Sequence, residues 1–199
     1  MEINMTEKEK MLAGKWYDAN FDKELLEERL KAEDLCFELN QTRPSNTEKR
    51  EKIINQLIPN CGKDVSILSP FYADYGIYSS VGEGSFINHG AYLMDGGKIT
   101  IGSHCFIGPN CGMYTAIHAY DSQQRNAGIE KALPISIGDD CWIGADVTIL
   151  PGVHIGKGSV IGAKSVVTKD IPEGVIALGN PCRVLREITE EDKIKKEEL

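Results

Sequence analysis

Residues 137–167 read IGDDCWIGADVTILPGVHIGKGSVIGAKSVV, and this stretch decides the fold. An aliphatic residue recurs at every sixth position, and glycine follows it in four of the repeats. The aliphatic positions are Ile137, Ile143, Ile149, Ile155, Ile161 and Val167. A period of six is typical of a parallel β-helix, in which three repeats make one triangular coil of about 18 residues. We expect each aliphatic side chain to point inward and to pack against its copies in the coils above and below.

The same spacing extends toward the N-terminus. The aliphatic positions Ile101, Ile107 and Met113 fall in phase with the later repeats, whereas Val81, Ile87 and Leu93 are offset by two. The turn Asp95-Gly96-Gly97 lies where two extra residues would be absorbed. Cys105, Cys111 and Cys141 occupy the position of the repeat that takes small residues, so we interpret them as packing residues and predict no metal site.

The repeat breaks once. The segment AYDSQQRNAGIEKALP, residues 119–134, is polar and lacks aliphatic residues in phase, which predicts an external loop over about 119–134. Loops on a rigid scaffold often carry function. His118 directly precedes this segment, and a neutral imidazole can take a proton from a hydroxyl near pH 7. From spacing alone, a solvated turn residue is the favoured interpretation of His118, and a catalytic role is the alternative.

The first part of the chain differs in texture from the repeats. It is rich in Glu, Lys and Leu, and capping boxes at Thr6–Glu9 and Ser45–Glu48 predict helix starts. Asp22 is a candidate N-cap for a helix over 23–39, which carries Leu26, Leu30 and Phe37 near helical spacing. We therefore divide the chain into a helical domain (1–58), a β-helix (59–187) and a charged tail (188–199).

Composition excludes several classes of protein. The 199 residues include 22 Lys plus Arg and 30 Asp plus Glu, and the net charge of −8 argues against a general nucleic-acid binder. The sequence has no apolar stretch that suits a membrane helix. The N-terminal residues do not resemble a secretory signal, and the cysteines form no CxxC pair. These features predict a cytoplasmic protein with reduced thiols.

Four motifs carry a resemblance to a known family. They are AGKWYD (13–18), DYG (74–76), CWIGADVTILPGV (141–153) and GNPCRV (179–184). Together with the His118 loop they resemble the maltose and galactoside O-acetyltransferases of the hexapeptide-repeat superfamily, with DYG nearer to the maltose enzymes. The resemblance implies a mainly β fold, a left-handed parallel β-helix with a short N-terminal helical domain, and a homotrimer with sites between subunits.

The resemblance also implies roles for individual residues. His118 would be the general base that deprotonates a sugar hydroxyl for direct attack on acetyl-CoA, and Asn88 would lie beside the reacting centre. Asp18, Asp74 and Asp95 would bind the acceptor. Galactoside acetyltransferases have two consecutive acidic residues where this chain has Asp95-Gly96, so only one of the two acids is present here. The CoA channel would be lined by Trp142, Ala145, Ala163, Thr168, Lys169, Arg183 and Arg186. Of these, the basic residues suit CoA phosphates in an acidic protein.

The sequence thus predicts an acetyl-CoA-dependent O-acetyltransferase that acts on a small sugar, such as maltose or glucose. Two alternatives remain open. The acceptor could be a non-sugar hydroxyl, as in serine or an antibiotic, or the chain could be a non-catalytic binding protein built on the same repeat. A zinc enzyme is disfavoured, because residues 119–130 supply no second histidine near His118.

Overall fold

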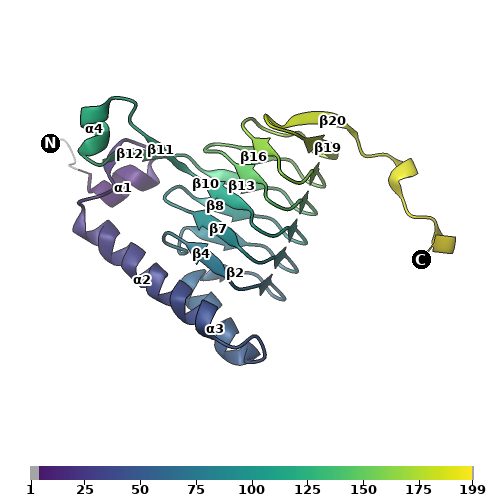
Figure 1. Cartoon of the computed structure of the whole chain (residues 1–199), viewed down its shortest axis with the longest axis horizontal. Helices are drawn as coiled ribbons and strands as arrows, with labels where there is room; N and C mark the ends of the chain where they lie inside the picture. The colour runs from purple at the N-terminus through teal and green to yellow at the C-terminus, as the bar shows by residue number, and fades with distance from the viewer. Residues whose placement is uncertain (1–4, 199) are drawn as a thin grey trace.

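The computed structural model describes residues 5–198 and shows a parallel β-helix flanked by N-terminal helices (Figure 1). Three sheets form the faces of a triangular prism. Face 1 contains β2 (Asn60–Cys61), β5 (Ser79–Val81), β8 (Ile99–Ile101), β13 (Ile135–Ile137) and β16 (His154–Ile155). Face 2 contains β3 (Ser66–Ile67), β6 (Phe86–Ile87), β9 (Phe106–Ile107), β14 (Trp142–Ile143), β17 (Val160–Ile161), β19 (Val175–Leu178) and β20 (Arg183–Glu187). Face 3 contains β4 (Phe71–Ala73), β7 (Ala91–Met94), β10 (Gly112–Tyr114), β15 (Thr148–Ile149) and β18 (Val166–Val167).

The register of the strands confirms the inward column of aliphatic residues. Ile143 stands opposite Ile107 in the preceding coil and Ile161 in the following one, and all three are buried. Burial of one such side chain stabilises the fold by about 1.5–3 kcal/mol. Glycine after the aliphatic residue lets the coils approach closely, because a Cβ at Gly144 would lie 2.6 Å from the backbone nitrogen of Ala163.

The offset of two in the earlier repeats is absorbed as expected. Val81 pairs with Ile101 and Leu93 pairs with Met113, so the early coils stay in register with the later ones. The extra residues lie between β7 and β8, where the N–H of Gly97 donates to the Thr115 hydroxyl at 2.9 Å. The turn thus lengthens one coil without moving the buried column.

From residue 5 onward, three helices precede the coils: α1 (Glu7–Leu12), α2 (Lys23–Gln41) and α3 (Thr47–Leu57). Thr6 and Glu9 form the predicted capping box, and Asp22 caps α2 by accepting from the N–H of Leu25. The predicted cap of α3 was wrong by one residue. Its N-cap is Asn46, whose side chain accepts from the N–H of Lys49, because the backbone turns into the helix one residue after Ser45.

The apolar face of α2 also differs from the prediction. Leu26, Leu30 and Phe37 are exposed on the outer side of the helix, and Phe37 is 68% exposed. The buried face is formed instead by Leu25, Ala32, Cys36 and Leu39. Small side chains at two of these positions allow α2 to lie close to the coils, so packing distance rather than side-chain size selects the inner face.

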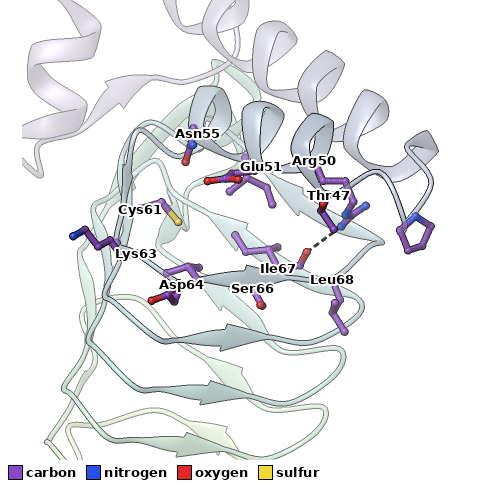
Figure 2. A pocket seen from close by; sticks show the side chains of 14 residues that line it. Thr47, Arg50, Glu51, Asn55, Cys61, Lys63, Asp64, Ser66, Ile67 and Leu68 are labelled. Atoms are coloured by element: carbon purple, nitrogen blue, oxygen red, sulfur yellow. Dashed lines mark hydrogen bonds between the residues drawn. The ribbon is translucent and has the colours of Figure 1, made fainter.

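A buried arginine joins the helices to the first coil. The Arg50 guanidinium donates to the carbonyls of Leu39 and Ile67 and to the Ser69 hydroxyl, at 2.9–3.2 Å. A cation near the last carbonyls of a helix is favourable, and here it satisfies the end of α2 while holding α3 in place. Figure 2 shows Arg50 reaching from α3 toward Ile67 of β3.

The interruption of the repeat is an ordered hairpin. β11 (Ala116–His118) and β12 (Ile129–Ala132) pair antiparallel, and α4 (Ser122–Asn126) connects them. β12 also pairs with β1 (Tyr17–Asp18), which makes a small three-stranded sheet beside α1 (Figure 1). Beyond β20, the part of the chain that the structure describes contains two short 3-10 turns, η1 (Glu190–Asp192) and η2 (Lys196–Glu198). Within residues 5–198, none of the helices combines the length and apolar character needed to cross a bilayer.

The buried column generates a stability prediction. We expect Ile149→Ala to lower the free energy of unfolding by about 2–5 kcal/mol, because it removes a fully buried side chain and leaves a cavity. Thr148→Ala, the outward-facing neighbour on the same strand, is the matched control and is expected to cost much less. Chemical denaturation of both variants measures the difference, and equal losses would contradict the inward column.

Candidate functional site

The hairpin places His118 at the end of β11, and the excursion from the prism begins at Ala116. His118 pairs across the hairpin with Glu130, and its Nδ1 lies 3.7 Å from the Glu130 Oε2. The imidazole is 58% exposed, whereas the carboxylate is 13% exposed. A carboxylate that is nearly buried therefore stands beside an accessible imidazole, at a distance somewhat longer than a hydrogen bond.

A pocket of about 620 Å³ opens at His118. It is mainly apolar and lies between the hairpin and the N-terminal segment. Its walls include Trp16, Ile117, Tyr120, Gln124 and Ile129. Aromatic walls with a few polar groups suit a small organic ligand. The pocket thus brings the predicted base to a place that a ligand can reach.

Asp18 lies on β1, next to this hairpin. One carboxylate oxygen accepts from the N–H groups of Asn20 and Phe21, at 3.1 and 3.0 Å. Gly128 approaches it so closely that a Cβ there would lie 2.9 Å from that oxygen. The half-buried Asp18 is therefore held in one orientation, with its second oxygen free of protein hydrogen bonds among residues 5–198.

Asp74 lies in a separate cleft of about 280 Å³ between α2 and face 3. The Tyr92 hydroxyl donates to one oxygen of the carboxylate. Burial raises the pKa of Asp74, while the hydrogen bond from Tyr92 and the charge of Arg29 oppose that rise. Arg29 and Tyr72 also line this cleft, so it offers hydrogen-bonding groups beside an aromatic ring.

Asp95 is not placed at the surface, where a residue that binds a sugar would be expected. It is fully buried, and its carboxylate accepts from the N–H groups of Tyr75 and Gly76 and from the Ser79 hydroxyl. Burial raises the pKa of Asp95, and these three donors counter the rise. Through these hydrogen bonds Asp95 holds the turn that follows Asp74. The Asp95 carboxylate could contact a sugar directly only if this turn opened.

Asn88 and His118 lie at opposite edges of face 3. Asn88 follows β6 and precedes β7, at the edge between faces 2 and 3 (edge 2/3). The His118 hairpin leaves after β10 and returns before β13, at the edge between faces 3 and 1 (edge 3/1). The Asn88 side-chain oxygen accepts from the N–H of His89, which leaves the amide N–H groups as donors. No hydrogen bond among residues 5–198 joins Asn88 to His118, and the pocket at His118 is not lined by Asn88.

The residues predicted for the CoA channel also separate into groups. Ala145 and Ala163 stack in adjacent coils at edge 2/3, and Trp142 is 57% exposed on face 2. Thr168 and Lys169 are exposed just after β18, at edge 3/1. Arg183 and Arg186 are exposed on β20 at the end of the prism. Edge 2/3 therefore carries Asn88 and the small residues, whereas edge 3/1 carries Asp74, the hairpin and Lys169.

Arg186 already has a partner in the tail. Its guanidinium forms two hydrogen bonds with Asp192, at 2.6 and 2.7 Å, and this pair holds the pKa of Asp192 well below its usual range. Both side chains face solvent, where an ion pair contributes little to stability. An anionic ligand at Arg186 would have to share or replace Asp192.

Another cavity of about 400 Å³ lies between α3 and the first coil (Figure 2). None of the predicted site residues lines it. Its buried cation, Arg50, is engaged by protein oxygens and belongs to the structural joint described above. We therefore place the candidate site at the hairpin and not in this cavity.

Sequence reasoning missed Tyr17 as a site residue. Its hydroxyl donates to Glu130 at 2.5 Å, although 113 positions separate the two residues in the chain. In the sequence, Tyr17 stands out only as part of the AGKWYD segment, and that segment does not indicate that β1 pairs with β12. Because β1 has only two residues, no alternation of apolar and polar residues could predict this strand.

Family models match three parts of the chain. Residues 10–62 match the maltose acetyltransferase hexapeptide capping motif. Residues 98–118 match the hexapeptide repeat of succinyl-transferase, and residues 134–169 match the bacterial transferase hexapeptide of six repeats. The first match covers the end of α1 and all of α2 and α3. The second covers coil residues and the first hairpin strand, β11, and the third covers the coils that follow the hairpin.

Whole-chain similarities agree with these matches. A putative acetyltransferase of Staphylococcus aureus is 57% identical over 184 residues, which are 92% of each chain. The crystal structure of a maltose O-acetyltransferase from Clostridium difficile is 48% identical, with a TM-score of 0.90 over 94% of this chain and 99% of that one. A galactoside acetyltransferase in complex with coenzyme A is 39% identical, with a TM-score of 0.92 over 97% and 96% of the two chains.

The environment of Asp95 generates a second prediction. Asp95→Ala leaves three buried donors without an acceptor, and we expect it to lower the free energy of unfolding by at least about 2 kcal/mol. Asp95→Asn keeps an acceptor oxygen and is expected to lose less. Thermal unfolding followed by circular dichroism distinguishes them. Unchanged stability of Asp95→Ala would show that the carboxylate does not hold the turn.

Proposed function

Because the chain belongs to the maltose and galactoside O-acetyltransferase family, whose fold is a left-handed β-helix of hexapeptide repeats, we propose that it transfers the acetyl group of acetyl-CoA to a hydroxyl of a small sugar. The family relationship supports an acetyltransferase and acetyl-CoA as its co-substrate. The sugar acceptor and the role of each residue are the finer parts of the proposal.

One observation carries the proposal. His118 is the histidine whose accessible imidazole borders a ligand-sized pocket and is backed by a nearly buried carboxylate. His104, by comparison, lies exposed in a regular turn of the coils. General-base catalysis needs a basic nitrogen within reach of the substrate and a group that orients it. In this chain Glu130, with Oε2 at 3.7 Å from Nδ1 of His118, is the group that we propose for the second role.

The acceptor side of the site is formed by residues that are already oriented. Asp18 is fixed by the N–H groups of Asn20 and Phe21, and Asp74 by the Tyr92 hydroxyl. Each carboxylate keeps an oxygen that can accept from a sugar hydroxyl. We assign Asp95 to the support of Asp74, since its own carboxylate is buried and fully used.

The donor side has the features that a CoA chain requires. Ala145 and Ala163 leave room along edge 2/3, and the exposed Trp142 offers an apolar ring beside it. Lys169, Arg183 and Arg186 are exposed cations that suit phosphate oxygens. Acetyl-CoA supplies a thioester whose carbonyl carbon can be attacked and whose thiol can leave.

The chain's own groups would then move one proton. His118 takes the proton of the acceptor hydroxyl as the hydroxyl oxygen bonds to the acetyl carbon. The same imidazolium gives the proton to the departing sulfur, so no acyl-enzyme is needed. The amide N–H groups of Asn88 would donate to the carbonyl oxygen as negative charge develops there. Glu130 would stabilise the imidazolium between the two proton transfers.

This scheme requires a second copy of the chain beside the first, and we propose that the copies form the homotrimer that the family resemblance implies. Asn88 and the alanines lie on edge 2/3, and the His118 hairpin lies on edge 3/1, so a single prism separates them by the width of face 3. A cyclic arrangement lets edge 3/1 of one copy meet edge 2/3 of its neighbour. The exposed Phe106 and Trp142 on face 2 are consistent with a face that a neighbouring copy covers.

The base assignment is tested by His118→Ala. We expect turnover to fall by roughly 10²–10⁴-fold, because the variant lacks the group that accepts the hydroxyl proton. Release of free CoA thiol with maltose, glucose, galactosides or serine as acceptors measures turnover and ranks the acceptors. CoA binding and the melting temperature should stay unchanged.

The matched control is His104→Ala, which removes an exposed imidazole from a regular coil and should leave turnover unchanged. Near-native turnover of His118→Ala, in protein whose oligomeric state is intact, would refute His118 as the base. Failure of the wild-type protein to bind CoA at millimolar concentration would favour the non-catalytic alternative.

The tail provides a separate test of the CoA residues. Asp192→Asn weakens the pair that occupies Arg186, so we expect the KM for acetyl-CoA to fall by roughly two- to fivefold, a range that reflects the small worth of exposed ion pairs. Glu191→Gln removes the same charge without breaking the pair and serves as the control. Equal KM values for the two variants would show that Arg186 does not contact the donor.

A further inference from the structure

Three side chains form one row across the small sheet that joins the N-terminal segment to the hairpin. In the strand order β1-β12-β11, Tyr17 pairs with Glu130, and Glu130 pairs with His118. Side chains of directly paired residues lie on the same face of a sheet and contact one another. The register therefore places the Glu130 carboxylate between the phenol and the imidazole.

The contacts within the row are directional. The Tyr17 hydroxyl donates to Oε1 of Glu130 at 2.5 Å, and Oε2 of Glu130 lies 3.7 Å from Nδ1 of His118. Tyr17 is 2% exposed, so the row runs from the buried interior to the accessible imidazole. Burial and the nearby carboxylate raise the pKa of Tyr17, and the phenol consequently stays protonated and can only donate to Glu130.

Gly96 supplies the space that this row needs. A Cβ at position 96 would lie 3.2 Å from the Tyr17 hydroxyl oxygen and 3.8 Å from Oε1 of Glu130. The Cβ of Ala132 closes the same side, 3.6 Å from that point. Any side chain at residue 96 would therefore press on the hydrogen bond between Tyr17 and Glu130.

We infer that Tyr17 is a positioning residue for His118. By holding one oxygen of Glu130, it turns the other toward Nδ1, so that the neutral imidazole carries its proton on Nδ1 and presents Nε2 to the acceptor hydroxyl. The N-terminal segment thus supplies part of the catalytic apparatus, in addition to packing against the coils. This inference rests on the proposed role of His118 as the base.

The test is Tyr17→Phe, which removes only the hydroxyl. We expect kcat to fall roughly tenfold, as befits the loss of a hydrogen bond to a charged group, with the KM for acetyl-CoA unchanged. Tyr78→Phe is the matched control. It is a tyrosine that packs against the same apolar cluster as Tyr17, and its hydroxyl donates to a different carboxylate, Glu28, at 2.7 Å and not to Glu130.

Two readouts separate positioning from a merely structural effect. Nitrogen NMR of labelled histidine should show one tautomer of His118 in the wild type and in Tyr78→Phe, and a mixture in Tyr17→Phe. In addition, Tyr17→Phe should cost little further activity in a Glu130→Gln background, because both changes disable the same row. Gly96→Ala should reproduce the loss of kcat and the mixed tautomer.

Unchanged kcat or an unchanged tautomer in Tyr17→Phe would overturn the inference, as would full additivity with Glu130→Gln. These results differ from a failure of the proposed function itself. Near-native turnover of His118→Ala would remove the base, whereas an inactive His118→Ala together with a fully active Tyr17→Phe would remove only the role of Tyr17.

Discussion

The inward column of aliphatic side chains constrains the rest of the structure. Ile143 must lie between Ile107 and Ile161. Each of the remaining coils must likewise place an aliphatic side chain against its copies one strand spacing, about 4.8 Å, above and below. A segment without an aliphatic residue every six positions cannot contribute to the column. Residues 116–132 are such a segment, so they leave the prism and form the hairpin. The period that builds the scaffold therefore also determines where His118 projects from it.

Much of the scaffold could be predicted because its signals are local or strictly periodic. The aliphatic column, the turn at Asp95–Gly97 and the caps at Thr6 and Asp22 all follow from short patterns. The buried face of α2 did not follow, because apolar residues occur on two sides of that helix and the sequence does not state which side meets the coils. Leu26, Leu30 and Phe37 have the larger side chains, yet closeness to the coils favours Ala32 and Cys36.

The candidate site was predictable in part. The broken repeat indicated His118, and resemblance supplied the other residues. The environment of Asp95 and the row through Tyr17 depend on contacts between residues far apart in the chain, which no spacing expresses. Arg50 was missed for the same reason, since its partners come from α2 and from the first coil. These polar groups are buried, and a buried polar group without a hydrogen-bond partner would lower the stability of the fold. Each of them is therefore held by specific partners.

Under the proposed function, the distribution of the predicted site residues over two edges implies that catalysis needs more than one copy of the chain. Asn88 and Ala145 lie at edge 2/3, whereas Asp74, His118 and Lys169 lie at edge 3/1. A flat, rigid face separates these edges, and its strands are tied into coils that cannot bend enough to bring them together. The hairpin is held to β1 and α1 of its own chain, so it is not free to fold back across face 3. Under the proposed function, the remaining way to place His118 beside Asn88 is to bring in the edge of another copy.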